Sequence, residues 1–134
     1  MAKMSKEVMD AFNSPKSIKV LATAGALSEI DAVPKGTMMA LDDETIAFAD
    51  IFGNKTNQNL ETNKKVAALA MSMAPMAGYQ VKGSFQGFQT SGELFDKFAT
   101  DVKAALKLGI KGVGTIKVDE VYTVAPPTPG KKIA

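Results

Sequence analysis

The hydrophobic positions of this chain fall into short runs with turn-forming residues between them, a pattern that predicts many strands and few helices. Apolar and β-branched residues dominate each run, and Gly, Pro and Asp residues separate them. The second run breaks at Pro34. Seven ranges fit this description: 18–23, 29–40, 45–50, 66–72, 79–90, 113–118 and 120–125. We predict strands over these ranges.

The run 79–90 does not alternate evenly. Val81 and Phe85 share one parity, whereas Phe88 takes the other. Gly83 lies between Val81 and Phe85, and glycine inside a strand often accompanies an extra residue on one side of the ladder. We therefore predict a β-bulge near Gly83.

Helical spacing occurs near both ends of the chain. Close to the start, Val8, Met9 and Phe12 lie on one side of a short helix that Pro15 ends, as a lid over one end of the fold. Later, Leu94, Phe98, Val102 and Ala105 follow one another at helical intervals up to Gly109.

The N-terminus of the second helix offers two candidate capping residues. Thr90 or Ser91 could cap it, and Glu93 would complete a capping box if Thr90 were the cap. A third, short helix is expected after Asn54. Many strands, one long helix and two short ones argue against alternating β–α units. The sequence predicts a mainly β fold, a closed or split antiparallel β-barrel with a few helices.

Composition narrows the class of protein. The chain has 134 residues, of which 46% are hydrophobic and 22% charged, with a net charge of +2. We expect a single domain over residues 1–134 and, because no basic block occurs, no nucleic-acid partner. The N-terminal segment lacks the apolar core of a signal peptide, and the longest apolar stretch, 66–79, is too short to span a bilayer. A cytoplasmic protein without a membrane partner is the expectation.

Several residue types are missing altogether. The chain contains no histidine, no cysteine and no arginine. These absences remove thiolate catalysis, cysteine-ligated metals, and the commonest metal ligand and general base. We expect no metal site, and the catalytic residues, if there are any, are unknown at this stage.

The segment "IFGNKTNQNL", from Ile51 to Leu60, resembles an anion site. A strand ends at Asp50, and Gly53 and Asn54 precede Lys55 and Thr56 at the start of a helix. Such a turn can aim free backbone N–H groups at an anion, with a lysine charge and a threonine hydroxyl beside them. Asn59 would lie near both on the helical wheel. The alternative is that Asn54 caps a surface helix and Lys55 is merely solvated.

Two familiar phosphate motifs do not match. A P-loop requires G-x-x-x-x-G-K-[ST], but Asn54 separates Gly53 from Lys55 and no upstream glycine has the required spacing. The glycines of "GIKGVG", from Gly109, follow a helix and precede a strand, which is the reverse of the dinucleotide fingerprint. Neither a nucleoside triphosphatase nor a dinucleotide-binding fold is predicted.

Taken together, five blocks of the chain resemble the pyridoxamine 5'-phosphate oxidase-like family of FMN-binding split barrels, and its small single-domain FMN-binding members in particular. The resemblance runs from about Ile18 to Lys131. It implies a six-stranded antiparallel Greek-key split barrel that forms homodimers, with one FMN in each of two clefts between the subunits. The blocks are "AVPKG", "LDDETIAFADIFGNKTNQNLETNKKVAALA", "GYQVKGSFQ", "SGELFDKF" and "VDEVYTVAPPTPGK".

The resemblance also implies a set of cofactor-binding positions. Lys55 and Thr56 correspond to the phosphate ligands, with Asn59 in support. Ala32, Val33 and Pro34 correspond to the strand whose backbone lies along the isoalloxazine ring. The remaining expected positions are Asp50, Ile51 and Phe52, which lead into the phosphate turn, and Lys82 and Gly83, which would approach a flavin from the other subunit.

The missing residue types refine what the resemblance implies. Vitamin B6 oxidation uses arginines and a histidine in the namesake enzymes, and haem-degrading relatives use a histidine, so neither activity is expected here. FMN itself carries redox chemistry and needs no such residues. An FMN-dependent oxidoreductase with a nicotinamide or protein electron donor is the leading hypothesis. The alternatives are a non-enzymatic FMN-binding electron carrier and a barrel that prefers another cofactor, such as a deazaflavin.

Overall fold

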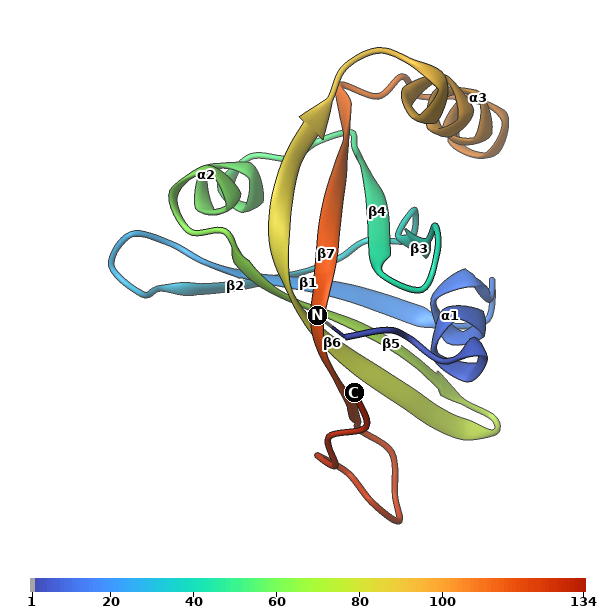
Figure 1. The fold of residues 1–134 in the computed structure, drawn as a ribbon. Helices are drawn as coiled ribbons and strands as arrows, with labels where there is room; N and C mark the ends of the chain where they lie inside the picture. Colours follow the sequence, from blue (N-terminus) through green and yellow to red (C-terminus); the bar gives the residue numbers. More distant parts are fainter. Residues whose placement is uncertain (1) are drawn as a thin grey trace.

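The computed structural model describes residues 2–134. In this part of the chain, seven strands form one antiparallel sheet that three helices flank (Figure 1). The helices are α1 (Lys6–Asn13), α2 (Lys55–Thr62) and α3 (Glu93–Leu106). The strands are β1 (Ile18–Ala24), β2 (Ile30–Pro34), β3 (Met39–Ala40), β4 (Thr45–Asp50), β5 (Lys65–Met73), β6 (Met76–Gln89) and β7 (Gly112–Thr123).

The sheet is curled, and its two edges are joined by a short piece of chain. The strand order is β2-β1-β5-β6-β7-β4-β3, so β2 and β3 are the two edge strands. Only residues 35–38 connect them. Because a connection of this length reaches less than about 20 Å, the two edges must lie near each other. The sheet therefore bends into a half-barrel, as the split-barrel prediction requires.

Three details of the predicted strands were wrong. The run 29–40 is two separate strands, β2 and β3, at opposite edges of the sheet. The runs 113–118 and 120–125 are one continuous strand, β7, which pairs with β6 along most of its length and with β4 over residues 112–117. The sheet has seven strands, as many as the predicted runs, rather than the six that the resemblance implied.

The predicted bulge at Gly83 is confirmed. The register between β6 and β7 shifts between Lys82 and Gly83, and again between Phe85 and Gly87. At Gly83 the backbones approach so closely that a Cβ atom would lie 2.5 Å from the carbonyl oxygen of Lys117. Glycine is therefore required at this point of the strand.

The interior of the half-barrel holds the main hydrophobic core. Phe48, Phe85 and Phe88 pack together, with ring centroids 4.9–6.4 Å apart. Helix α1 places Val8 and Phe12 into the same core, which confirms the predicted lid. Its N-terminus is capped by Ser5, whose hydroxyl accepts a hydrogen bond from the Val8 N–H.

Helix α3 packs on the other face of β4 and β7. Phe98 and Val102 contact Ala47, Ala49 and Val113 there in a second apolar cluster. The predicted capping box was wrong, because Gly92 is the N-cap residue and no side chain in the described part of the chain caps this helix. Within residues 2–134, no helix is both long and apolar enough to cross a membrane.

Candidate functional site

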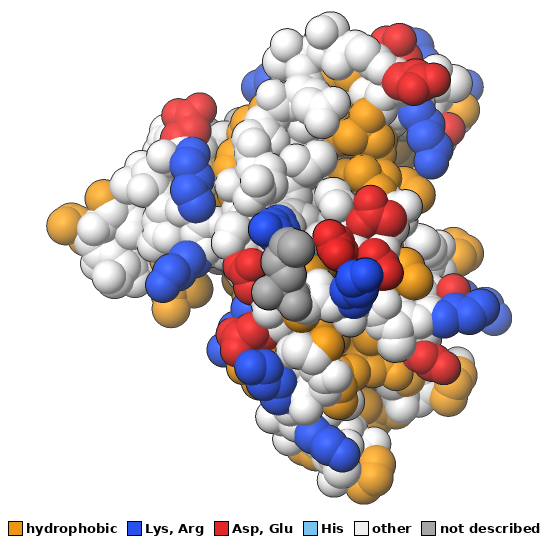
Figure 2. Space-filling model, viewed as in Figure 1, with side chains coloured by type: hydrophobic (Ala, Val, Ile, Leu, Met, Phe, Trp, Pro, Cys, Tyr) orange, Lys and Arg blue, Asp and Glu red, His pale blue; other side chains and the backbone are white. Residues whose placement is uncertain are grey.

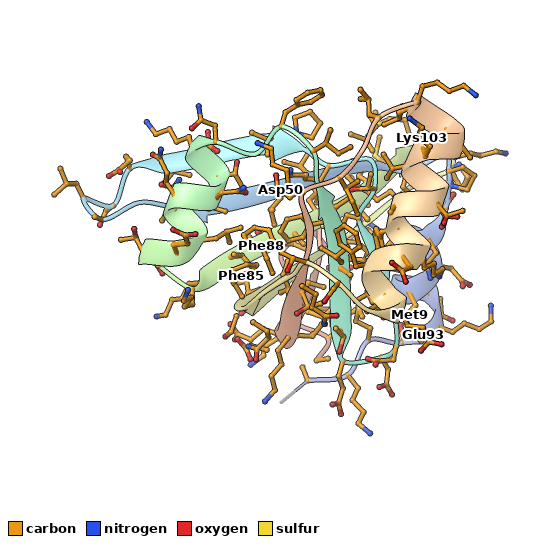
Figure 3. All side chains as sticks on the ribbon, turned by 90° about the horizontal axis from the view of Figure 1, so that it is seen from above. Met9, Asp50, Phe85, Phe88, Glu93 and Lys103 are labelled. Carbon is orange, nitrogen blue, oxygen red and sulfur yellow. The ribbon has the colours of Figure 1, made fainter. Side chains whose placement is uncertain are left out.

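A cavity of about 730 Å³ lies between the two edges of the sheet, helix α3 and the turn before α2. Its walls come from β2, the connection 35–37, β3, the end of β4, the turn 51–54, the start of α2 and one face of α3. Cavities of 300–1,000 Å³ are typical of sites for small molecules and cofactors. Seen from above, Asp50 lies between α2 and α3, close to this region (Figure 3).

The turn before α2 is held by the carboxylate of Asp50. Its Oδ1 accepts a hydrogen bond from the Gly53 N–H at 2.9 Å, and its Oδ2 accepts one from the Asn57 side-chain amide at 2.8 Å. A Cβ atom on Gly53 would lie 2.4 Å from both Asp50 Oδ1 and Asn57 Oδ1. Asp50 itself is buried and does not line the cavity. Asp50 therefore holds the turn in shape from the side that faces away from the cavity.

The N-terminus of α2 faces the cavity. Asn54 is the N-cap residue, as predicted, but its side chain makes no capping hydrogen bond. Among residues 2–134, no side chain therefore caps the first N–H groups of the helix. Gly53, Asn54, Lys55 and Thr56 all line the cavity. Lys55 is exposed, so its ammonium is free to approach a ligand. This end of the cavity is suited to an anion.

Thr56 and Asn59 are both buried on α2, and each is bonded to a different strand. The Thr56 hydroxyl donates to Oδ2 of Asp31 on β2 at 2.9 Å. The Asn59 side-chain amide donates to the hydroxyl of Thr23 on β1 at 3.0 Å. Asn59 does not line the cavity. Its side chain fixes α2 against the sheet, and so supports the turn indirectly.

The opposite wall of the cavity is mainly apolar, with Asp101 of α3 as its charged residue. Helix α3 contributes Phe98, Val102, Ala105 and Leu106, and the edge strands contribute Val33 and Met39. Hydrophobic side chains gather below α3, over β4 and β3 (Figure 2). Phe52, in the turn before α2, and Leu106, on α3, are 77% and 52% exposed, so large apolar side chains remain uncovered on both sides of the cavity. A flat hydrophobic ring system would fit such a surface.

Lys35 is a half-buried cation in the cavity wall. Its ammonium lies 5.5 Å from the centre of the Phe48 ring. Burial lowers the pKa of the Lys35 ammonium below its ordinary value of 10.5, and the carboxylate of Asp50 offsets part of that shift. Lys35 therefore brings a second positive charge to the cavity, in addition to Lys55.

The residues predicted from the sequence divide into three groups. Val33, Pro34, Ile51, Phe52, Lys55 and Thr56 line the cavity together. Asp50 and Asn59 lie behind it, and Ala32 points to the other face of β2. Lys82 and Gly83 line a separate hollow of about 470 Å³, between β1, β5, β6 and β7. A single chain therefore does not bring Lys82 and Gly83 to the cavity.

Several residues that line the cavity are not among those predicted from the sequence. Asp31 lies one position before the predicted segment, and Lys35 lies one position after it. The alternation of β2 gives a signal for Asp31, because it shares a face with Val33. No local pattern places α3 beside the turn before α2, because the two helices are separated by strands β5 and β6.

Comparison with solved structures supports the fold. An FMN-binding protein from Syntrophomonas wolfei matches with a TM-score of 0.82 and 18% identity, over 89% of this chain and 84% of that one. HutZ, the heme storage protein from Vibrio cholerae, matches with a TM-score of 0.66 and 11% identity, over 90% of this chain and 94% of that one. At these identities the likeness concerns the fold.

Comparison of sequences identifies the family. An uncharacterized protein of Methanocaldococcus jannaschii is 34% identical, over the whole of this chain and 90% of its own length. The family model described as pyridoxamine 5'-phosphate oxidase matches residues 4–125. This match includes both edges of the sheet, the turn before α2 and helix α3. The chain therefore belongs to the pyridoxamine 5'-phosphate oxidase-like family of split barrels.

Proposed function

We propose that this protein binds FMN in the cavity between its two sheet edges and works as an FMN-dependent oxidoreductase. One observation carries the proposal: the same cavity joins an uncapped helix N-terminus with Lys55 at one end to a wide apolar wall at the other. FMN has this same division, with an anionic phosphate at one end and a flat apolar ring at the other.

The two lysines in the cavity wall, Lys35 and Lys55, are consistent with this ligand, although the carboxylates of Asp31 and Asp101 also line the cavity. Lys55 and the uncapped N–H groups of α2 are the phosphate-binding groups in this proposal. Because the chain has no arginine, the bidentate grip that arginine gives to phosphate is replaced by backbone donors and one point charge. The ring would lie against Val33, Pro34 and the α3 wall. Bound FMN would supply the redox chemistry, and the protein would supply position and charge.

A haem is a weaker candidate for the same cavity. Haem iron is held by histidine, cysteine, methionine or tyrosine. Met39 alone among the described cavity-lining residues belongs to these types. The chain has no histidine or cysteine anywhere. FMN requires no such ligand and so fits the residues better.

The proposal includes a homodimer, because the sheet is apolar on both faces. Val66, Ala68 and Ala70 of β5 face the core, whereas Ala67, Leu69 and Met71 line a hollow on the outer face. A strand that is apolar on both faces is normally buried on both, because each face is removed from water by packing against other parts of the protein or a partner. A second copy of the chain placed on this outer face would also bring its Lys82 and Gly83 toward a cleft shared by two subunits.

The first experiment measures flavin binding directly. FMN titrated into the purified protein should show quenched fluorescence and a saturable shift of the oxidised flavin spectrum. Lys55→Met should weaken FMN binding by about tenfold or more, because it removes one charge-assisted contact. Lys16→Met, on an exposed lysine away from the cavity, is the matched control. Unchanged affinity in Lys55→Met would contradict the phosphate assignment.

A second experiment separates an enzyme from an electron carrier. The FMN-loaded protein is mixed with NADH or NADPH in the absence of oxygen, and the flavin absorbance is followed. Rapid bleaching supports an oxidoreductase with a nicotinamide donor. If neither nucleotide bleaches the flavin but a reduced carrier protein does, the electron-carrier alternative is favoured. Titration with a deazaflavin in place of FMN tests the remaining alternative by comparing the two affinities.

A further inference from the structure

The polar end of the cavity contains a hydrogen bond that limits what it can bind. The Thr56 hydroxyl donates its one proton to Oδ2 of Asp31 at 2.9 Å. The direction is fixed chemically, because an ionised carboxylate has no proton to give. Thr56 Oγ1 can then only accept further hydrogen bonds. The Asp31 carboxylate can also only accept them. The side chains of Thr56 and Asp31 therefore offer a ligand acceptors alone.

A phosphate group is a poor match for that surface. Ionised phosphate oxygens are also acceptors, so neither Asp31 nor the Thr56 hydroxyl can bind them while their own bond persists. The carboxylate of Asp31 would also repel a phosphate at short range. In contrast, the uncapped N–H groups of α2 and the exposed Lys55 ammonium are donors. Donors and acceptors thus occupy different parts of the same end of the cavity.

The acceptor pair is held in place from two sides. Asp31 is half-buried on β2, where it pairs with Thr23 of β1 in the antiparallel ladder. The Thr23 hydroxyl accepts a hydrogen bond from the side-chain amide of Asn59, and this bond fixes α2 beside β1. The hydrogen bond between Thr56 and Asp31 closes this arrangement. Asp31 and Thr56 therefore form a preorganised surface rather than a loose surface charge.

We propose that Asp31, together with the Thr56 hydroxyl, binds hydroxyl groups of the ribityl chain of FMN and so determines which flavins the cavity accepts. This inference rests on the proposed function. The ribityl chain carries three hydroxyl groups between the ring and the phosphate, and each can donate a hydrogen bond. A carboxylate that accepts from sugar hydroxyls is a common device in nucleotide sites. Asp31 would be a specificity-determining residue, and Lys55 would contact the phosphate.

Three flavins separate these roles. FMN has the ribityl chain and the phosphate, riboflavin has the chain alone, and lumiflavin has neither. Asp31→Ala should weaken riboflavin binding by about tenfold and leave lumiflavin binding unchanged. It should weaken FMN binding by a smaller factor, because the variant also loses the repulsion between the carboxylate and the phosphate. Lys55→Met should weaken FMN alone. Dissociation constants are measured by fluorescence quenching for each variant, and the unfolding temperature shows whether each variant is folded.

Asp31→Asn is the second variant, and it keeps the fold testable if Asp31→Ala unfolds. Its side-chain oxygen can still accept from Thr56, but it has lost the negative charge. It should bind riboflavin less tightly than the wild type and more tightly than Asp31→Ala. Two results would overturn the inference: tighter FMN binding with unchanged riboflavin binding in either variant, or an equal loss for all three flavins. Failure of the wild type to bind FMN would instead refute the proposed function.

Discussion

At the scale of single residues, Asp50 has a different position at the turn before α2 from the one predicted. Asp50 was expected to line the flavin cleft, yet its carboxylate is buried and bonded to Gly53 and Asn57. Asn57 Oδ1 is buried and has no hydrogen-bond partner among the described residues. The turn is thus packed tightly enough to leave an acceptor unpaired, a cost of roughly 1–3 kcal/mol.

Gly53→Ala tests this packing. The new Cβ atom would lie 2.4 Å from Asp50 Oδ1 and Asn57 Oδ1, so the hydrogen bonds of Asp50 must break or lengthen. We expect a loss of about 1–3 kcal/mol in the free energy of unfolding, together with weaker FMN binding. Urea unfolding and flavin titration measure the two effects. Gly109→Ala is the control, since nothing lies within 4 Å of a Cβ atom there; equal effects of both substitutions would refute the argument.

Lys35 gives a pH-dependent prediction. Its pKa is lowered in the folded protein, mainly by burial. Between that lowered pKa and 10.5, the unfolded chain binds more protons at this site than the folded one, so the contribution of Lys35 to stability rises with pH. The free energy of unfolding of the wild type minus that of Lys35→Met should therefore increase over this window. A difference that stays flat over this window would contradict the prediction.

At the scale of elements, local pattern located the strands and helices but did not reveal their neighbours. Period-2 and helical spacing depend on nearby residues, so β1, β4, β5, β6 and all three helices could be predicted with small errors at their ends. The division of 29–40 into two edge strands could not be predicted in this way, because it depends on which strands lie beside each half of the run. The same holds for the site: Lys55 and Thr56 follow from a local motif, whereas the α3 wall depends on tertiary packing.

The C-terminal end of α3 offers a test at this scale. Lys107 is its C-cap residue and adopts a left-handed conformation, with φ 59° and ψ 28°. Glycine adopts this conformation without the strain that a Cβ atom imposes. Lys107→Gly should therefore raise the free energy of unfolding by about 0.5–1 kcal/mol. The matched control is Lys103→Gly, within the helix, which should lower it by about 1 kcal/mol. A loss in both variants would contradict the prediction.

At the scale of the whole molecule, the proposed homodimer can be tested on the outer face of β1 and β5. Val20, Leu69 and Met71 line a hollow there. In the proposed homodimer this face is covered by the second copy, so Leu69→Lys should give a monomer, because it would place a charge in the apolar contact. Analytical ultracentrifugation of the wild type and the variant measures this. Gln58→Lys, on the exposed face of α2, is the control. A wild type that remains monomeric when loaded with FMN would exclude the shared cleft.

The connection of only four residues between β2 and β3 also bears on the order of events in folding. Four strands separate β2 from β4 in the sheet, yet both line the cavity. The cavity therefore cannot exist until the entire sheet has formed and its two edges have met. In a stopped-flow refolding experiment with FMN present, far-UV circular dichroism should recover first and flavin quenching later. The ligand would then report the last stage of folding, and its binding would slow the first stage of unfolding.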